Sequence, residues 1–178
     1  AFSVTTGNDN VAIGQSALQT VTTSTRNVAV GTTAAYAGGG TGYNVYMGYE
    51  AGKWHIGGGA VHIGSEAGQN ASGSSNTFVG YQSGKGGTTS APYSSGTSNT
   101  ALGYQALTAF TTGNSNVAVG YEAGEDITTG YYNTLVGYEA GENLTTGASN
   151  VFMGYEAGAG KIANVGAIAI GYREIGRA

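Results

Sequence analysis

Residues 116–124 have the sequence NVAVGYEAG, residues 133–141 have NTLVGYEAG, and residues 150–158 have NVFMGYEAG. The three segments begin at Asn116, Asn133 and Asn150, so the interval between them is constant. A fixed period of this kind indicates a repeat architecture, in which every unit packs on the next. The same pattern extends from this stretch in both directions, so the repeat determines the fold of the whole chain.

A glycine closes the apolar segment of each unit, and these glycines mark ten units. The same interval separates most neighbouring glycines, whereas it is one position shorter on two occasions and six positions longer once. We predict that they are structural repeat positions. They are Gly14, Gly31, Gly48, Gly64, Gly80, Gly103, Gly120, Gly137, Gly154 and Gly171.

The three residues before each closing glycine predict a short β-strand. The first of the three is β-branched in every unit, which favours a strand over a helix. The last is aliphatic in every unit, and we expect it to form the core stripe. This row is Ile13, Val30, Met47, Ile63, Val79, Leu102, Val119, Val136, Met153 and Ile170. The middle residue points to the opposite face and is also mostly apolar, so we expect one face of the strand to meet the coil interior and the other a neighbouring subunit.

These patterns predict an all-β chain, a repetitive parallel β-solenoid or β-roll with coils of about 17 residues. Residues 1–178 form one repeat domain of about ten coils. Because stacked strands lie about 4.8 Å apart, the rod should be roughly 50 Å long. Asn opens eight of the ten units and should stack into a ladder. A Gly three positions earlier in many units is expected to supply a positive φ at a corner.

Composition excludes several classes of protein. The chain has 34 Gly, one Pro and no Cys, with a net charge of −4. Few large apolar side chains leave a thin core, which backbone hydrogen bonds and partner chains must supplement. The six Lys and Arg form no cluster, which argues against nucleic acid as a partner. No apolar run predicts membrane insertion. Since the sequence does not begin with Met, we expect a fragment or a processed product.

The repeat resembles a known class of protein. Asn99 to Leu107 and Asn116 to Gly124 carry the pattern best, and Thr-Thr-Gly segments follow in several units. The pattern is similar to the glycine-rich repeats of bacteriophage tail-fibre proteins. More loosely, it is similar to the head repeats of trimeric autotransporter adhesins, which build a parallel β-roll. The resemblance implies a homotrimer, a virion or extracellular location, and a role in attachment.

Three repeated or isolated side-chain types are candidates for chemistry, and none predicts catalysis. Glutamates at one repeat position, such as Glu122 and Glu139, are equivalent, whereas general acid and base catalysis needs two carboxylates in different environments. Tyrosines beside them, such as Tyr121, should cover apolar surface, with sugar binding as an alternative. His62 would bind a metal only if three chains met around it. We therefore expect no enzyme activity, no catalytic or metal-binding residues and no cofactor.

Specific recognition is expected where the repeat is broken. The fifth unit carries six additional residues, which predict a projecting loop at 85–98. A shorter unit contains the only Trp of the chain, and Trp is favoured at binding surfaces. The candidate receptor contacts are Trp54, His55, Lys85, Pro92 and Tyr93.

The function expected from these observations is that of a structural shaft and attachment element of a phage tail fibre. Its partners would be further copies of the chain and a glycan or protein receptor on the host surface. A bacterial surface adhesin or an extracellular filament subunit of the same repeat build is the first alternative. A polysaccharide-degrading tailspike is the second, and it requires two carboxylates that converge in a groove.

Overall fold

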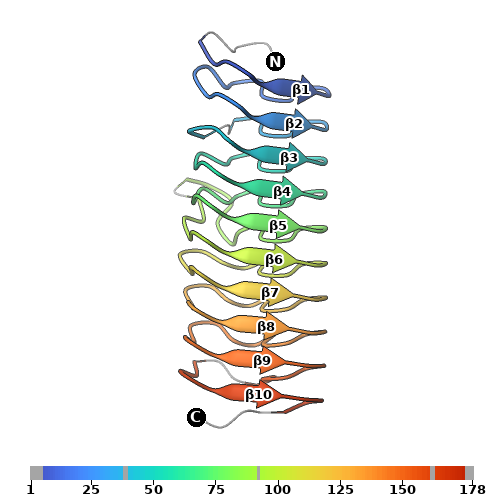
Figure 1. The fold of residues 1–178 in the computed structure, drawn as a ribbon, viewed down its shortest axis with the longest axis vertical. Coiled ribbons are helices and arrows are strands. Elements are labelled where there is room, and N and C mark those ends of the chain that lie inside the picture. The colour runs from blue at the N-terminus through green and yellow to red at the C-terminus, as the bar shows by residue number, and fades with distance from the viewer. Residues whose placement is uncertain (1–5, 38–39, 92, 161–162, 175–178) are drawn as a thin grey trace.

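The computed structural model of the protein describes residues 6–37, 40–91, 93–160 and 163–174. Ten strands stack in chain order into one parallel sheet (Figure 1). They are β1 (Val11–Ile13), β2 (Val28–Val30), β3 (Val45–Met47), β4 (Val61–Ile63), β5 (Thr77–Val79), β6 (Thr100–Leu102), β7 (Val117–Val119), β8 (Thr134–Val136), β9 (Val151–Met153) and β10 (Ile168–Ile170). Within the described ranges, no helix is long and apolar enough to cross a membrane.

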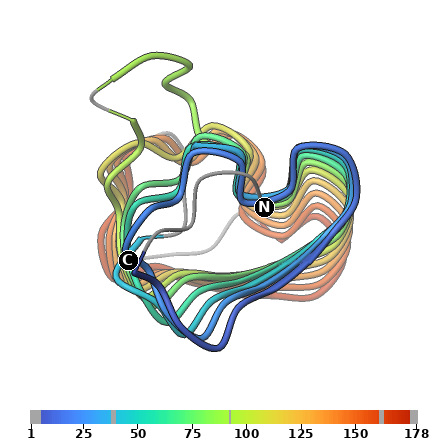
Figure 2. The same cartoon turned by 90° about the horizontal axis from the view of Figure 1, so that it is seen from above.

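The strand register follows the sequence repeat. Val117 of β7 pairs with Thr134 of β8, and Val119 pairs with Val136. Since the offset between paired residues equals the repeat length, equivalent residues of successive coils lie on top of one another, as Figure 2 shows along the rod axis. The prediction of an all-β parallel β-solenoid is confirmed. We number each coil by its strand.

The prediction of the core stripe was wrong about which strand face points inward. The middle residue of the strand is the buried one in β2 to β10, as in Phe78, Leu135 and Phe152, which are completely buried. The aliphatic residue before the closing glycine instead points outward, and Leu102 is 48% exposed. A two-residue period assigns alternate residues to opposite faces but does not say which face lies inside when both are apolar.

Two facing positions inside a coil, the middle of the strand and the residue four after the closing glycine, exchange large and small side chains between coils. Coil 9 has Phe152 in the strand and Gly158 opposite, where an added Cβ would lie 2.2 Å from the Phe152 ring. Coil 6 reverses the arrangement, because Ala101 in the strand accompanies a completely buried Leu107. This exchange of large and small residues keeps the interior densely packed while the backbone stays the same.

The column of closing glycines is required by its backbone geometry. Gly137 has φ +138°, a region that L side chains rarely adopt. A Cβ at this position would also lie 2.2 Å from the carbonyl oxygen of Gly154 in the next coil. The predicted structural role of the ten closing glycines agrees with these contacts, which repeat along the column from Gly14 to Gly154.

The glycines three positions before Asn have a different role from the one predicted. Gly113 does not have a positive φ, and its added Cβ would lie 2.5 Å from the carbonyl oxygen of Gly130 in the next coil. Close approach between coils therefore requires these glycines. The left-handed residue at this corner is the one directly before Asn, for example Ser115 with φ 55° and Tyr132 with φ 57°.

The asparagines form the expected ladder inside the rod. Asn116 Oδ1 accepts hydrogen bonds from the backbone N–H of Asn133 at 3.1 Å and from its Nδ2 at 3.0 Å. Asn116 Nδ2 also donates to the Gly130 carbonyl at 2.9 Å, at the corner of its own coil. The ladder is interrupted once between Asn10 and Asn150, at Ala60, whose N–H still donates to Asn44 Oδ1.

The predicted loop at 85–98 is present but shorter. Gly86 and Gly87 still pair with coil 6, because their N–H groups donate to the carbonyls of Thr108 and Phe110. Ser94 rejoins coil 4 through hydrogen bonds with Asn70 and Ser72. The projecting part therefore begins after Gly87 and ends before Ser94, and it extends away from the stack in Figure 2. Pro92 lies outside the described residues.

Candidate functional site

The outward face of the sheet is a continuous apolar strip, which we call the outer strip. It consists of the first and third residues of all ten strands, so each coil contributes one β-branched and one aliphatic side chain. Met47, Leu102 and Met153 are each exposed by 40% or more. None of the positions carries a charge. An exposed apolar surface that crosses every coil of a rod is typical of an interaction surface.

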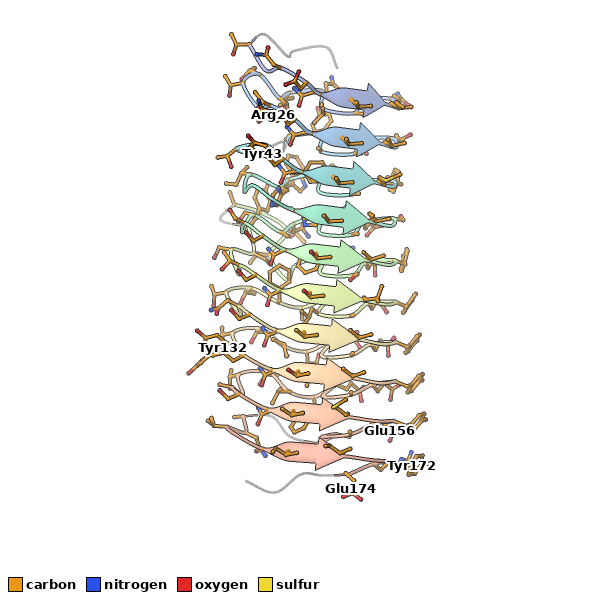
Figure 3. The ribbon with its side chains drawn as sticks, in the orientation of Figure 1. Arg26, Tyr43, Tyr132, Glu156, Tyr172 and Glu174 are labelled. Carbon is orange, nitrogen blue, oxygen red and sulfur yellow. The ribbon has the colours of Figure 1, made fainter. Side chains whose placement is uncertain are left out.

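A row of stacked tyrosines borders the outer strip, and we call it the tyrosine ladder. Its members are Tyr81, Tyr104, Tyr121, Tyr138, Tyr155 and Tyr172. Neighbouring ring centroids lie 4.9 to 5.3 Å apart, and the planes are within 19° of parallel. Figure 3 places Tyr172 and Glu156 beyond one end of the strands, with Tyr43 and Tyr132 beyond the other.

The ladder exposes ring edges and hydroxyls rather than ring faces. The stacked neighbours cover both faces of Tyr104, Tyr121 and Tyr138. Sugar binding to tyrosine, the alternative raised by the sequence, needs an open ring face, and the interior of the ladder offers none. The hydrogen-bonded carboxylate of Glu122 raises the pKa of Tyr121 to about 12, and Glu139 does the same for Tyr138.

The glutamate row is partly paired with cations rather than only solvated. Lys85 Nζ lies 2.5 Å from Glu66 Oε2, and Lys53 Nζ lies 2.7 Å from Glu50 Oε1. At the other end of the row, the Arg173 guanidinium holds Glu156 in two hydrogen bonds. The hydrogen bond from Lys85 lowers the pKa of Glu66.

Between the two ends of the glutamate row, acidic side chains accumulate on coils 7 and 8. Burial raises the pKa of Glu125 and of Glu142, and the carboxylates beside each of them raise it further. These groups repel one another across adjacent coils, because equivalent residues stack at the strand spacing. The row therefore has two cation-paired ends with an acidic part between them.

Two of the five predicted receptor contacts meet beside the loop. Tyr93 stacks on Trp54 at 5.7 Å and 11°, and Tyr36 meets Trp54 edge-on at 6.2 Å. We call these three residues the aromatic patch. Lys53 Nζ lies 5.5 Å from the centre of the Trp54 ring. Trp54 and Tyr93 are both half-buried, so each keeps part of its ring at the surface.

His55 and Lys85 are not part of the patch, and Pro92 lies outside the described residues. His55 was assigned to the surface incorrectly: it is completely buried, because its position in the coil is the interior position that Ile127 and Leu144 occupy elsewhere. Lys85 is half-buried and paired with Glu66 at the base of the loop.

The metal hypothesis for His62 does not fit the geometry. His62 is completely buried within its own coil, so three chains cannot bring their His62 side chains to a common axis. In the part of the chain that the structure describes, no three His, Cys, Asp or Glu side chains gather in a way that would hold a metal ion.

Sequence reasoning missed the stacking of Tyr93 on Trp54. The two residues are far apart in the sequence and belong to different coils. The sequence contains only an indirect sign of this contact. The repeat period is broken in the coil that carries Trp54 and again at the insertion that carries Tyr93. Breaks in nearby coils of a solenoid lie close together in space.

The fold and its surfaces define a β-solenoid repeat protein with an apolar outer strip and one projecting loop. A comparison with protein-family models, curated proteins and solved structures found no match for the chain.

Proposed function

We propose that the protein is a non-enzymatic structural shaft and attachment element of a phage tail fibre, located on the virion outside the host cell. The observation that carries the proposal is the uninterrupted outer strip, which runs the length of a regular rod. A shaft needs a repeated backbone with a constant cross-section and a face by which chains associate. The similarity of residues 99–124 to tail-fibre repeats supports the same role.

The outer strip is the contact surface of a homotrimer in this proposal. Its side chains are Val, Thr, Ile, Met or Leu in all ten coils. Burial of such a surface contributes about 25 cal/mol per Å² of apolar area, a gain that grows with every coil added. Because the rows are straight and in register, identical chains side by side would match residue to residue along their length.

The native mass of the particle tests the trimer. Leu102→Lys places a charge in the middle of the strip, and an unpaired charge at a packed interface should weaken association by about 100-fold or more. Val165→Lys is the matched control, since Val165 is 66% exposed but lies outside the strip. We expect trimers for the wild type and for Val165→Lys, and folded monomers for Leu102→Lys. A wild-type protein that stays monomeric at high concentration contradicts the proposal.

Attachment is assigned to the loop and the aromatic patch. The loop projects away from the stack in Figure 2 and lies behind the sheet in Figure 1. An assembly through the outer strip would therefore leave the loop accessible. Thr89, Ser90 and Ala91 are exposed, and Tyr93 anchors the loop to Trp54.

Shortening the loop tests this assignment. Deletion of residues 88–93 removes the six additional residues and restores the regular interval between Gly80 and Gly103. We expect the variant to keep its circular dichroism spectrum and its trimeric mass while losing adhesion to bacterial cells that bind the labelled wild type. Unchanged adhesion would place the receptor contact elsewhere on the rod.

A further inference from the structure

The interior of coils 3 to 5 contains a cluster of four aromatic rings, three of which carry polar atoms that a structural shaft does not require. His62, in the middle of β4, stacks on Phe78 of β5 at 5.1 Å and 18°. It meets Tyr46 of β3 edge-on at 5.7 Å and His55 edge-on at 5.0 Å. All four side chains are completely buried.

The hydrogen bonds of His55 fix its neutral form. Its Nε2 lies 3.0 Å from the Gly73 carbonyl, which only accepts, so Nε2 carries the proton. Its Nδ1 lies 2.7 Å from the Tyr46 hydroxyl and accepts a hydrogen bond from it. A second proton on Nδ1 would meet the O–H donor directly, and the Tyr46 hydroxyl would have to turn away.

His62 has no such partners. Neither of its ring nitrogens makes a hydrogen bond within the described part of the chain, although both are buried. The titratable groups that face it are Tyr46 from β3 and His55 from the turn after β3, while β5 presents Phe78 and the nearby turns present Gly52 and Gly68. Among the residues that the structure describes, no carboxylate faces the ring, so an imidazolium would lack a charged partner there.

Packing alone does not explain a histidine at this position. Phe78 and Phe152 occupy the same place in coils 5 and 9, and each faces a glycine at the same distance along the chain as Gly68 from His62. A phenyl ring therefore fills this space without a buried polar atom. What histidine adds is a proton-binding site.

We propose that His55 and His62 make the rod between β3 and β5 an acid-sensitive joint, which opens at mildly acidic pH while the coils on either side stay closed. This inference is independent of the tail-fibre role. Opening would also release the aromatic patch, because Trp54 directly precedes His55 and holds Tyr93 of the loop.

The direction of the effect follows from which state binds protons. Burial lowers the pKa of His55 to about 4 and lowers that of His62 well below its usual range, where the nearby His55 lowers it further. Opened coils return both imidazoles to a pKa of about 6.5. The joint is thus most stable above about pH 6.5, where both histidines are neutral in either state. Its stability falls as the pH drops from there towards the folded pKa values.

Three carboxylates elsewhere on the rod do not produce this effect. The lowered pKa of Glu66 keeps its pair with Lys85 ionised at pH 5. The raised pKa values of Glu125 and Glu142 mean that protonation stabilises coils 7 and 8 as the pH falls. The difference in stability between coils 3 to 5 and coils 7 and 8 should therefore increase as the pH falls.

Hydrogen exchange of the intact chain at pH 7.5 and pH 5 tests the joint, after correction for the intrinsic pH dependence of exchange. We expect protection in β3 to β5 to fall about 30-fold more per histidine than protection in β7 to β9, the factor set by an opened-state pKa of about 6.5. Emission from Trp54, the only Trp of the chain, should shift over the same range. An equal fall in both regions would overturn the proposal.

Two variants isolate the histidines. His62→Phe combined with His55→Leu reproduces residues found at these positions in other coils and should abolish the regional difference. Persistence of the difference in the folded double variant would overturn the proposal. Phe152→His leaves the joint intact and should transfer acid sensitivity to β9. If β9 stays closed at pH 5 in that variant, a buried histidine in this fold is not sufficient, and the proposal fails.

Discussion

Coils 6 to 9 and coils 3 to 5 have the same backbone stacking but differ in repeat period, buried side chains and loops. Coils 6 to 9 keep a constant period, an unbroken asparagine ladder, stacked tyrosines and an interior in which all other buried side chains are apolar. Coils 3 to 5 have two short intervals and one long interval, a gap in the ladder at Ala60, buried histidines and the projecting loop. The strand register nevertheless passes through both regions without interruption. Backbone stacking therefore holds the rod together, and the irregular coils are free to carry other features.

Substitutions in the closing-glycine column should have the largest effect and should not distinguish the two regions. Gly137→Ala and Gly64→Ala both combine a positive φ with a Cβ 2.2 to 2.3 Å from the next carbonyl oxygen. We expect each to lower the free energy of unfolding by about 4 kcal/mol. Denaturant titration measures the loss.

Gly160→Ala provides the control, because Gly160 has φ +80° but no atom of the described residues within 4 Å of an added Cβ. A left-handed backbone alone should cost about 1–2 kcal/mol. Equal losses at Gly160 and Gly137 would show that the backbone conformation, and not the contact between coils, requires glycine in the column.

Asparagine removal should separate the two regions. Asn116→Ala deletes four side-chain hydrogen bonds inside the continuous ladder, and the buried groups left behind lose their partners. Asn44→Ala, next to the gap, deletes three. We expect losses of about 3 kcal/mol for Asn116→Ala and about 2 kcal/mol for Asn44→Ala. Thermal unfolding with matched denaturant curves measures both losses. A larger loss for Asn44→Ala would contradict the idea that an asparagine contributes more stability within a longer uninterrupted ladder.

Repairing the gap should make the irregular region more like the regular one. Ala60→Asn places an amide between Asn44 and Asn76, where its Oδ1 would accept from the Asn76 N–H. We expect a gain of about 1 kcal/mol, measured as a higher denaturant midpoint. A loss of stability would mean that the shorter coil 4 has no room for the side chain, whose position is completely buried.

The ion pair of Lys85 with Glu66 should contribute least. Both side chains are partly exposed, so Lys85→Gln should lower stability at pH 7 by about 0.5 kcal/mol. Because the folded pKa of Glu66 is lowered, this contribution is fully present above its ordinary pKa and is lost as the pH falls from there through the folded pKa. Unfolding curves for the two proteins should therefore converge as the pH falls until Glu66 is protonated in the folded state. A difference that remains at that point would indicate a packing role for the Lys85 side chain.

The repeat predicted the strands, their register, the closing-glycine column and the asparagine ladder, because all of these depend on identity at a fixed spacing. It did not predict which strand face lies inside. Val117 and Val119 are larger and more apolar than Ala118, yet Ala118 is buried and the two valines face outward. The deciding feature was the narrow coil interior, where a residue as small as Ala118 can face inward because Ile127, elsewhere in the same coil, supplies the large buried side chain.

The candidate site was harder to predict for a related reason. The outer strip was mistaken for the core, since an apolar row that meets solvent in one chain resembles a buried one. His55 was placed at the surface by its neighbour Trp54, although its distance from Gly48 matches that of Ile127 from Gly120. Aligning that second interior position across coils would have assigned it correctly.

The direction of the hydrogen bonds has a mechanical consequence. In this solenoid the bonds between strands run along the rod axis, so tension applied to the two ends loads them directly and peels off one coil at a time. A coil of about 17 residues rises about 4.8 Å when stacked and extends to about 58 Å when pulled straight. A single rod is therefore an extensible tether that gains about 50 Å for every coil released and dissipates force gradually instead of breaking.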